Sequence, residues 1–252
     1  MRIGSAPLVI TAIVATLGTA ACGGGQSSTP APAAPVTNPV DPATAGTVTG
    51  KVTFMGTPPP AEPIKMSSDP RCVNPDAKTE AVMVAGDGSL QNVFVYVKDG
   101  LGSLKFPVPT TALVLDQKGC QYRPHVFGVQ AGQPIEILNS DMTLHNIHAW
   151  PQTNQEFNVG QALQGIKDTH VFTTQEIMVP FRCDVHKWMN SFVGVVAHPF
   201  FAVTGADGAF ELKGLPPGTY TIEAWHEKFG TKTASVTIGA KESKDVPFTF
   251  SG

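Results

Sequence analysis

The stretch 177–196, IMVPFRCDVHKWMNSFVGVV, decides the fold of this chain. Its two ends, 177–181 and 192–196, are apolar runs rich in β-branched and aromatic residues, which are typical of strands. Between these runs, Cys183, His186 and Met189 follow one another at every third position. The segment therefore predicts two strands joined by a short loop that presents a thiol, an imidazole and a thioether.

These three donors indicate a metal site of a particular kind. A thiolate, an imidazole and a weak axial thioether suit a trigonal copper centre, which also needs a second imidazole from elsewhere in the chain. Four Cys, seven His and seven Met in 252 residues would produce this spacing by chance only about 0.003 times per chain. Zinc is the rival metal, but structural zinc sites prefer four Cys or His donors. The loop therefore favours copper.

The rest of the chain from residue 46 onward is also strand-like, and no segment shows a sustained helical period. Gly, Pro, Asn and Asp clusters separate many short runs, as expected for a sandwich or barrel. We predict an all-β protein with strands at 47–54, 93–97, 112–115, 134–138, 169–172, 177–181, 192–196, 202–204, 209–212, 220–225, 235–238 and 246–250.

Residues 197–252 form a second β unit. Asp207-Gly208 between two alternating runs is a hairpin signal. Together with the Leu-Pro-Pro-Gly-Thr-Tyr stretch at 215–220, this segment resembles the carboxypeptidase regulatory-like domain, a transthyretin-like sandwich. Fifty-six residues are few for an independent core, so the strand at 46–55 is an alternative addition to this unit. The working division is contiguous, with domains at 46–196 and 197–252.

The region around the loop resembles a second family. Asn139, Asp141 and the run Leu144-His145-Asn146-Ile147-His148, followed by Cys183-x-x-His186-x-x-Met189, look like the small blue copper cupredoxins of the amicyanin and plastocyanin type. The resemblance spans roughly residues 90–196 and implies a Greek-key β-sandwich. It also implies that one copper ion, cycling between Cu(I) and Cu(II), is held by His145, Cys183, His186 and Met189.

Three neighbours of these ligands have expected roles. By the resemblance, the Asn146 side chain ties the two ligand loops together, and His186 reaches the surface. Trp188 would shield the metal from water and contribute to a docking face. His148 is a candidate back-up ligand, because we expect it on the same side of a strand as His145; the alternative is that it does not bind metal, as the second histidine of His-Asn-x-His does not in the family pattern.

The first residues have the layout of a secretory signal peptide, with an apolar run from Ala6 to Leu17 followed by small residues. Cys22 follows two alanines and resembles the lipidated cysteine of a bacterial lipoprotein. We therefore expect a signal peptide at 1–21, lipidation of Cys22 and a disordered tether at 22–45 that is rich in Pro, Ala and Gly. The expected location is the bacterial cell envelope, either periplasmic or on the outer surface.

The remaining cysteines are Cys72 and Cys120. If Cys22 carries lipid and Cys183 binds metal, these two can form a disulfide that closes a loop of about 49 residues. The alternative is that one of them is a metal ligand, with His125 five residues after Cys120.

The charges are nearly balanced, with 17 basic and 20 acidic residues, and no basic stripe suits a phosphate backbone. Nucleic acid is therefore not an expected partner. The leading functional hypothesis is a one-electron carrier, not an enzyme, which works with redox partner proteins and is bound to the membrane by its lipid. The alternatives are copper storage or delivery, and a module that binds cell-wall carbohydrate or protein and has an appended copper site.

Overall fold

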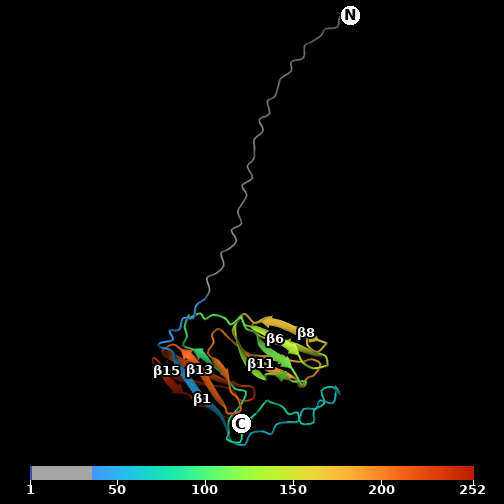
Figure 1. Cartoon of the computed structure of the whole chain (residues 1–252), viewed down its shortest axis with the longest axis horizontal. Coiled ribbons are helices and arrows are strands. Elements are labelled where there is room, and N and C mark those ends of the chain that lie inside the picture. The colour runs from blue at the N-terminus through green and yellow to red at the C-terminus, as the bar shows by residue number, and fades with distance from the viewer. Residues whose placement is uncertain (2–35) are drawn as a thin grey trace. The chain divides into compact units, whose positions relative to one another are not determined.

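The computed structural model describes Met1 and residues 36–252, and this part of the chain is built from strands (Figure 1). Seventeen strands and no α-helix occur in it, which confirms the predicted all-β class. In the same part, no helix is long and apolar enough to cross a bilayer. The expected signal peptide, Cys22 and most of the expected tether lie outside the described residues.

The strands form four sheets that enclose two main cores. We call the first pair of sheets the central sandwich. Its five-stranded sheet has the order β5-β11-β10-β7-β8, and its four-stranded sheet has the order β4-β3-β6-β9. The bounds are β3 Leu113–Gln117, β4 Tyr122–Arg123, β5 Val126–Gln130, β6 Pro134–Asn139, β7 His145–Ala149, β8 Phe157–Gln161, β9 Lys167–Val171, β10 Glu176–Arg182 and β11 Asn190–Val196.

We call the second pair of sheets the terminal sandwich. One sheet places β1 between β13 and β16, with β17 also paired to β1, and the other has the order β12-β2-β14-β15. The bounds are β1 Gly46–Met55, β2 Phe94–Asp99, β12 Phe201–Val203, β13 Ala209–Leu215, β14 Gly218–His226, β15 Gly230–Ile238, β16 Ser243–Asp245 and β17 Phe248–Ser251.

The terminal sandwich takes two of its strands from the first hundred residues. β1 pairs antiparallel with β13 and parallel with β17, and β2 pairs antiparallel with β14. Alternate residues of β1 point inward, so that Val48 and Val52 are fully buried in the core of this sandwich. The terminal sandwich therefore includes strands from both sides of residue 196, where the contiguous division was placed. The C-terminal strands alone lack the apolar surface that β1 and β2 contribute.

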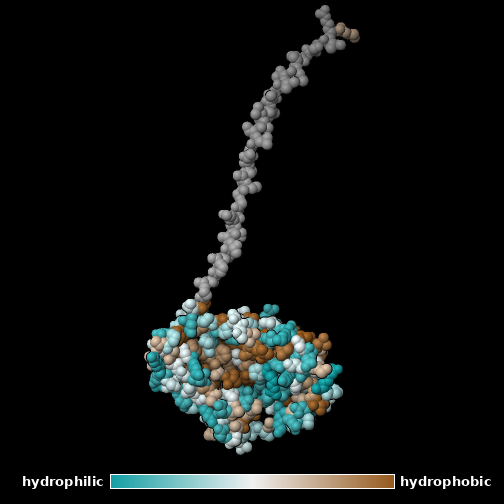
Figure 2. All heavy atoms as spheres, in the orientation of Figure 1, coloured by the Kyte–Doolittle hydropathy of each residue, from teal (hydrophilic) through white to brown (hydrophobic). Residues whose placement is uncertain are grey.

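A close contact joins the two sandwiches. Gly128 of β5 and Gly194 of β11 are paired in register, and the ring of Phe94 from β2 packs against both. A Cβ atom added to Gly194 would lie 2.3 Å from this ring, so the absence of a side chain is required there. Figure 2 shows apolar residues interspersed with hydrophilic ones on the face drawn.

The segment between β1 and β2 has little regular structure, and part of it covers the central sandwich. We call residues 63–78 the cap loop; its ends meet in an isolated antiparallel bridge between Pro63 and Lys78. A disulfide joins Cys72 of this loop to Cys120, the pair expected from the sequence. Met66 and Cys72 are buried in the core of the central sandwich. The cap loop is therefore attached to the sandwich both covalently and by packing.

The last residues of the expected tether differ from a free coil. Val40 packs against the core of the terminal sandwich, and the amide of Lys241 donates to the carbonyl of Thr44 at 3.1 Å. Val40 and Thr44 thus already contact the terminal sandwich before β1 begins.

Candidate metal centre

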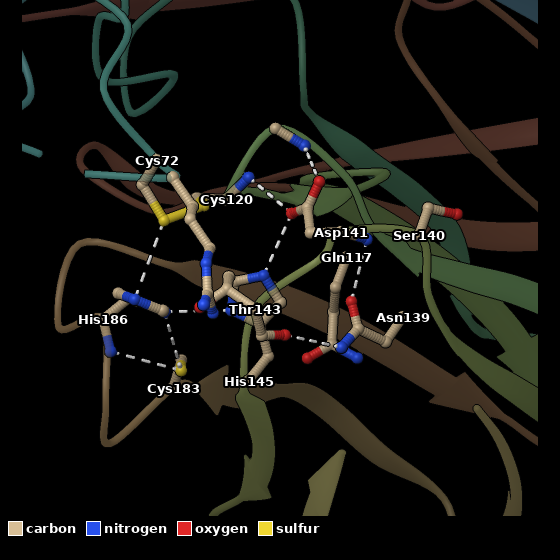
Figure 3. Close-up of polar contacts among 12 residues, drawn as sticks. Cys72, Gln117, Cys120, Asn139, Ser140, Asp141, Thr143, His145, Cys183 and His186 are labelled. Carbon is tan, nitrogen blue, oxygen red and sulfur yellow. Dashed lines mark hydrogen bonds and ion pairs between the residues drawn. A yellow bond between two sulfur atoms is a disulfide. The ribbon is translucent and has the colours of Figure 1, made fainter. Parts of the chain in front are cut away.

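Three of the four predicted ligands meet at one end of the central sandwich. His145 is the first residue of β7, Cys183 follows the last residue of β10, and His186 lies in the loop that leads to β11. Antiparallel pairing of β10 with β7 brings these positions together although they are far apart in sequence. The Nδ1 atoms of His145 and His186 lie 2.9 Å apart, and the Sγ atom of Cys183 lies 3.9 Å from Nδ1 of His186 (Figure 3).

These distances fit a shared ion. Imidazole nitrogen and thiolate sulfur bind ions such as zinc at about 2.0 to 2.3 Å, so two donors on one ion lie within about 4.4 Å of each other. Both measured pairs satisfy this limit, and the donor atoms of all three residues lie within 4.8 Å of one another. The three residues are at most 2% exposed. A buried thiol with two imidazoles is a donor set that suits copper.

Met189, the fourth predicted ligand, ends the same loop. It is 1% exposed, and its amide donates to the carbonyl of His186 at 2.8 Å. The amide of Cys183 in turn donates to the carbonyl of Met189 at 3.2 Å. These bonds close the loop, so the three-residue spacing seen in the sequence becomes one tight turn that holds all three side chains near the sandwich end.

Each histidine of the site also contacts a carboxylate through its other ring nitrogen. Nε2 of His145 lies 3.0 Å from Oδ2 of Asp141, and Nε2 of His186 lies 3.1 Å from Oδ2 of Asp69. Asp141 was noted in the sequence beside the first ligand. Asp69 was not identified, because it comes from the cap loop and lies far from the ligands in sequence. The one available signal was its position three residues before Cys72, because a disulfide from Cys72 to Cys120 would bring this segment close to the site.

The electrostatics of the site favour a thiolate. Burial opposes ionisation of Cys183, but hydrogen bonding from His145 and from backbone amides lowers the pKa of its thiol. Burial would lower the pKa of His145, but hydrogen bonds with Asp141 and Cys183 outweigh it and raise this pKa to about 9. Burial lowers the pKa of His186, and Asp69 only partly opposes this. The groups around Cys183 therefore favour its thiolate, the form that binds metal.

Asn146 lies between the two ligand loops, as expected. Its Oδ1 atom accepts the amide of Asp184 at 2.7 Å, and its Nδ2 atom donates to Oδ2 of Asp184 at 2.9 Å. Because Asn146 follows His145 and Asp184 follows Cys183, these bonds fix the distance between the two ligand-bearing segments.

His148 takes no part in the cluster. It is three residues from His145 on β7, and residues an odd number apart on a strand point to opposite faces. The expectation that both rings lie on the same side was therefore wrong. The ring of His148 instead lies 3.1 Å from a carboxylate oxygen of Asp184 and 2.8 Å from one of Glu156.

The environment of His186 also differs from the expectation. This residue was expected to reach the surface, but it is 2% exposed. The cap loop covers it, with Sγ of Cys72 at 3.7 Å from Nε2 of His186. Trp188 packs on the ring of His186 with a centroid distance of 5.0 Å and is itself half-buried. Its Nε1 atom donates to the carbonyl of Cys120 at 2.9 Å.

His125, the histidine nearest Cys120 in sequence, contacts Glu227 and not the cysteine.

Comparison with known family models supports the resemblance of the C-terminal segment. Residues 194–251 match the carboxypeptidase regulatory-like domain family, as expected from the sequence. No curated protein matches the chain.

Solved structures similar to the chain include copper proteins. A Cu(I) form of an amicyanin variant is 20% identical, with a TM-score of 0.30, and the match covers 35% of this chain and 85% of amicyanin. A purple cupredoxin from Nitrosopumilus maritimus is also 20% identical, with a TM-score of 0.29 and coverages of 33% and 98%. A copper-containing nitrite reductase from Thermus scotoductus SA-01 is 16% identical, with a TM-score of 0.33; the match covers 40% of this chain and 26% of the reductase. The chain is thus an all-β protein in which residues 194–251 match the carboxypeptidase regulatory-like family and to which cupredoxins are structurally similar.

Proposed function

We propose that this protein is a one-electron carrier in which His145, Cys183, His186 and Met189 hold a single copper ion. The convergence of a buried thiol and one nitrogen from each of two imidazoles within 4.8 Å of one another carries this proposal. When bound, copper supplies a couple between Cu(I) and Cu(II). The thiol and thioether donors favour Cu(I), and the imidazoles suit Cu(II), so the set tolerates both states.

The protein scaffold meets the main requirement of a carrier, which is a geometry that changes little between oxidation states. The Asn146 side chain and the loop bonds between Cys183 and Met189 hold the donors in place without metal. The Nε2 atom of each histidine ring contacts a carboxylate, which fixes the orientation of the ring. The near-complete burial of the donors excludes water and leaves little room for a substrate, which supports a carrier in preference to an enzyme.

We propose Trp188 as the contact between the site and a redox partner protein. His186 lies under the cap loop and cannot touch a partner directly. Trp188 packs on the ring of His186 and is only half-buried, so part of it is accessible to solvent. Electrons would therefore pass through this ring, because His186, which was expected at the surface, is buried.

The test is the absorption and paramagnetic resonance spectrum of the full chain loaded with Cu(II). The wild type should show an intense visible thiolate-to-copper band, and Cys183→Ser should abolish it because the thiolate is the absorbing ligand. Met189→Leu should keep the colour and only shift the reduction potential, since the axial ligand tunes the site. A colourless, redox-inactive wild-type complex would reject the carrier function.

We further propose that lipidation of Cys22 anchors the protein at the bacterial cell envelope. Detergent partitioning of the protein expressed in a bacterial host should place the wild type in the membrane fraction and Cys22→Ser in the soluble fraction. For the terminal sandwich, contact with cell-wall carbohydrate is the proposed role. Binding should be tested with the whole chain, because β1 and β2 supply central strands of this sandwich.

A further inference from the structure

Each of the two histidines of the site contacts one aspartate, and the two aspartates come from different parts of the chain. Asp141, which follows β6, contacts Nε2 of His145, and Asp69, from the cap loop, contacts Nε2 of His186. The Nδ1 atoms of the two rings face each other, and Nδ1 of His186 also faces Cys183. Each ring is therefore placed between a carboxylate on one side and the donor cluster on the other.

This arrangement selects the protonation pattern that metal binding needs. An ionised carboxylate only accepts hydrogen bonds, so the Nε2 atom that faces it must carry the hydrogen. In the metal-binding neutral ring, the lone pair is then left on Nδ1, which points into the cluster. A carboxylate behind a ligating imidazole also makes that imidazole a stronger donor.

Both carboxylates are themselves fixed. Thr143 Oγ1 donates to Oδ2 of Asp69 at 2.7 Å, and the amide of Arg71 donates to Oδ1 at 2.9 Å. The amides of Gly119 and Cys120 each donate to Asp141 at 2.8 Å. The orientation of each aspartate is thus set before any ion binds.

The disulfide links the two supports. The amide of Cys120 donates to the side chain of Asp141, and the amide of Cys72 donates to the carbonyl of Asp69 at 3.0 Å. Cys72 and Cys120 are joined to each other. One covalent bridge therefore holds the segments that carry both carboxylates against the two histidines.

We propose that Asp69 and Asp141 are a pair of positioning residues that orient His145 and His186 and favour Cu(II) over Cu(I). This inference rests on the proposed copper site. The physical reason is charge: a carboxylate behind the ring increases electron donation, and the more highly charged ion gains more from it. Asp69 has this role although it lies outside both ligand-bearing loops.

The test uses the full chain, copper alone as the probe, and the variants Asp69→Asn and Asp141→Asn. Asparagine keeps an oxygen acceptor of the same shape and removes the charge. Each variant should bind Cu(II) about 10- to 100-fold more weakly, as is typical for loss of such a partner. Cu(I) affinity should change less, so the reduction potential should rise by up to about 59 mV for each tenfold difference between the two. Asp76→Asn, an exposed position in the same cap loop, is the matched control and should change neither.

The outcomes separate the two proposals. Equal weakening of Cu(I) and Cu(II) binding, with an unchanged potential, would mean that the aspartates only support the fold, and would overturn this inference alone. Absence of the thiolate-to-copper band in the wild type would overturn the copper site itself. If Asp69→Asn does not fold, Thr143→Val removes the hydroxyl that shares Oδ2 of Asp69 with His186, which leaves more charge on that oxygen and should lower the potential; no shift in this variant would contradict the proposed role of Asp69.

Discussion

The side chain of Asn146 is the point at which the two ligand-bearing segments can be separated by one substitution. It is 7% exposed and accepts the amide of Asp184 at 2.7 Å. It also donates to the carboxylate of Asp184 at 2.9 Å and to Oδ1 of Asn158 at 2.8 Å. Asn146→Leu keeps a similar volume and removes these three bonds together with a longer one, in which Oδ1 accepts the amide of Val185 at 3.4 Å.

The expected loss of stability follows from these bonds. Each of the two neutral hydrogen bonds, from the Asp184 amide and to Asn158, contributes about 1 kcal/mol or less. The bond from Nδ2 of Asn146 to the Asp184 carboxylate contributes at the low end of the free-energy range for hydrogen bonds with a charged partner, because the Asp184 side chain is 50% exposed. Together these give a loss of about 2 to 4 kcal/mol, a large part of the about 5 to 15 kcal/mol that stabilises a typical domain.

Urea unfolding of the metal-free protein measures the loss, and hydrogen exchange of the Asp184 amide reports where it occurs. Exchange at this amide should become faster in Asn146→Leu than at amides of the terminal sandwich. Gln155→Ala is the control, because Gln155 is exposed in the connection between β7 and β8 and its side chain takes part in none of these bonds; it should change stability by about 0.5 kcal/mol or less. A similarly small change in Asn146→Leu, with unaltered exchange at Asp184, would refute the reasoning.

Two further predictions concern stability. Burial lowers the pKa of His226 from 6.5 to about 4, so the unfolded chain binds its proton first as the pH falls. Stability present above pH 6.5 should therefore decrease by up to about 3 kcal/mol by pH 4; thermal unfolding of wild type and His226→Phe across this range checks it, and equal slopes would contradict it. Replacing both Cys72 and Cys120 by Ala should cost about 4 kcal/mol by the chain-entropy estimate for a sequence separation of 48. Urea unfolding measures this, and a loss below about 1 kcal/mol would exclude the disulfide as a major constraint.

Local sequence was sufficient for the strands and for one ligand loop. Alternation and β-branched runs identify a strand such as β1 because side chains of a strand point alternately to two faces. The spacing of Cys183, His186 and Met189 is readable because all three lie on one turn. The same alternation predicts the face of His148, because its odd separation from His145 places it on the opposite side of the strand.

The tertiary structure alone decided the features that depend on contacts between distant parts of the chain. The pairing of β1 with β13 and β17 joins the first strand to the last ones, and no local pattern encodes that choice. Asp69 reaches His186 across 117 positions of sequence, and the same cap loop buries the histidine that was expected at the surface. The sequence by itself determined which atoms can bind copper, because donor chemistry is a property of single residues. The carboxylates that contact the ligand imidazoles, and the residues that shield the donor atoms from water, are set by packing. Packing exists only once the chain has folded.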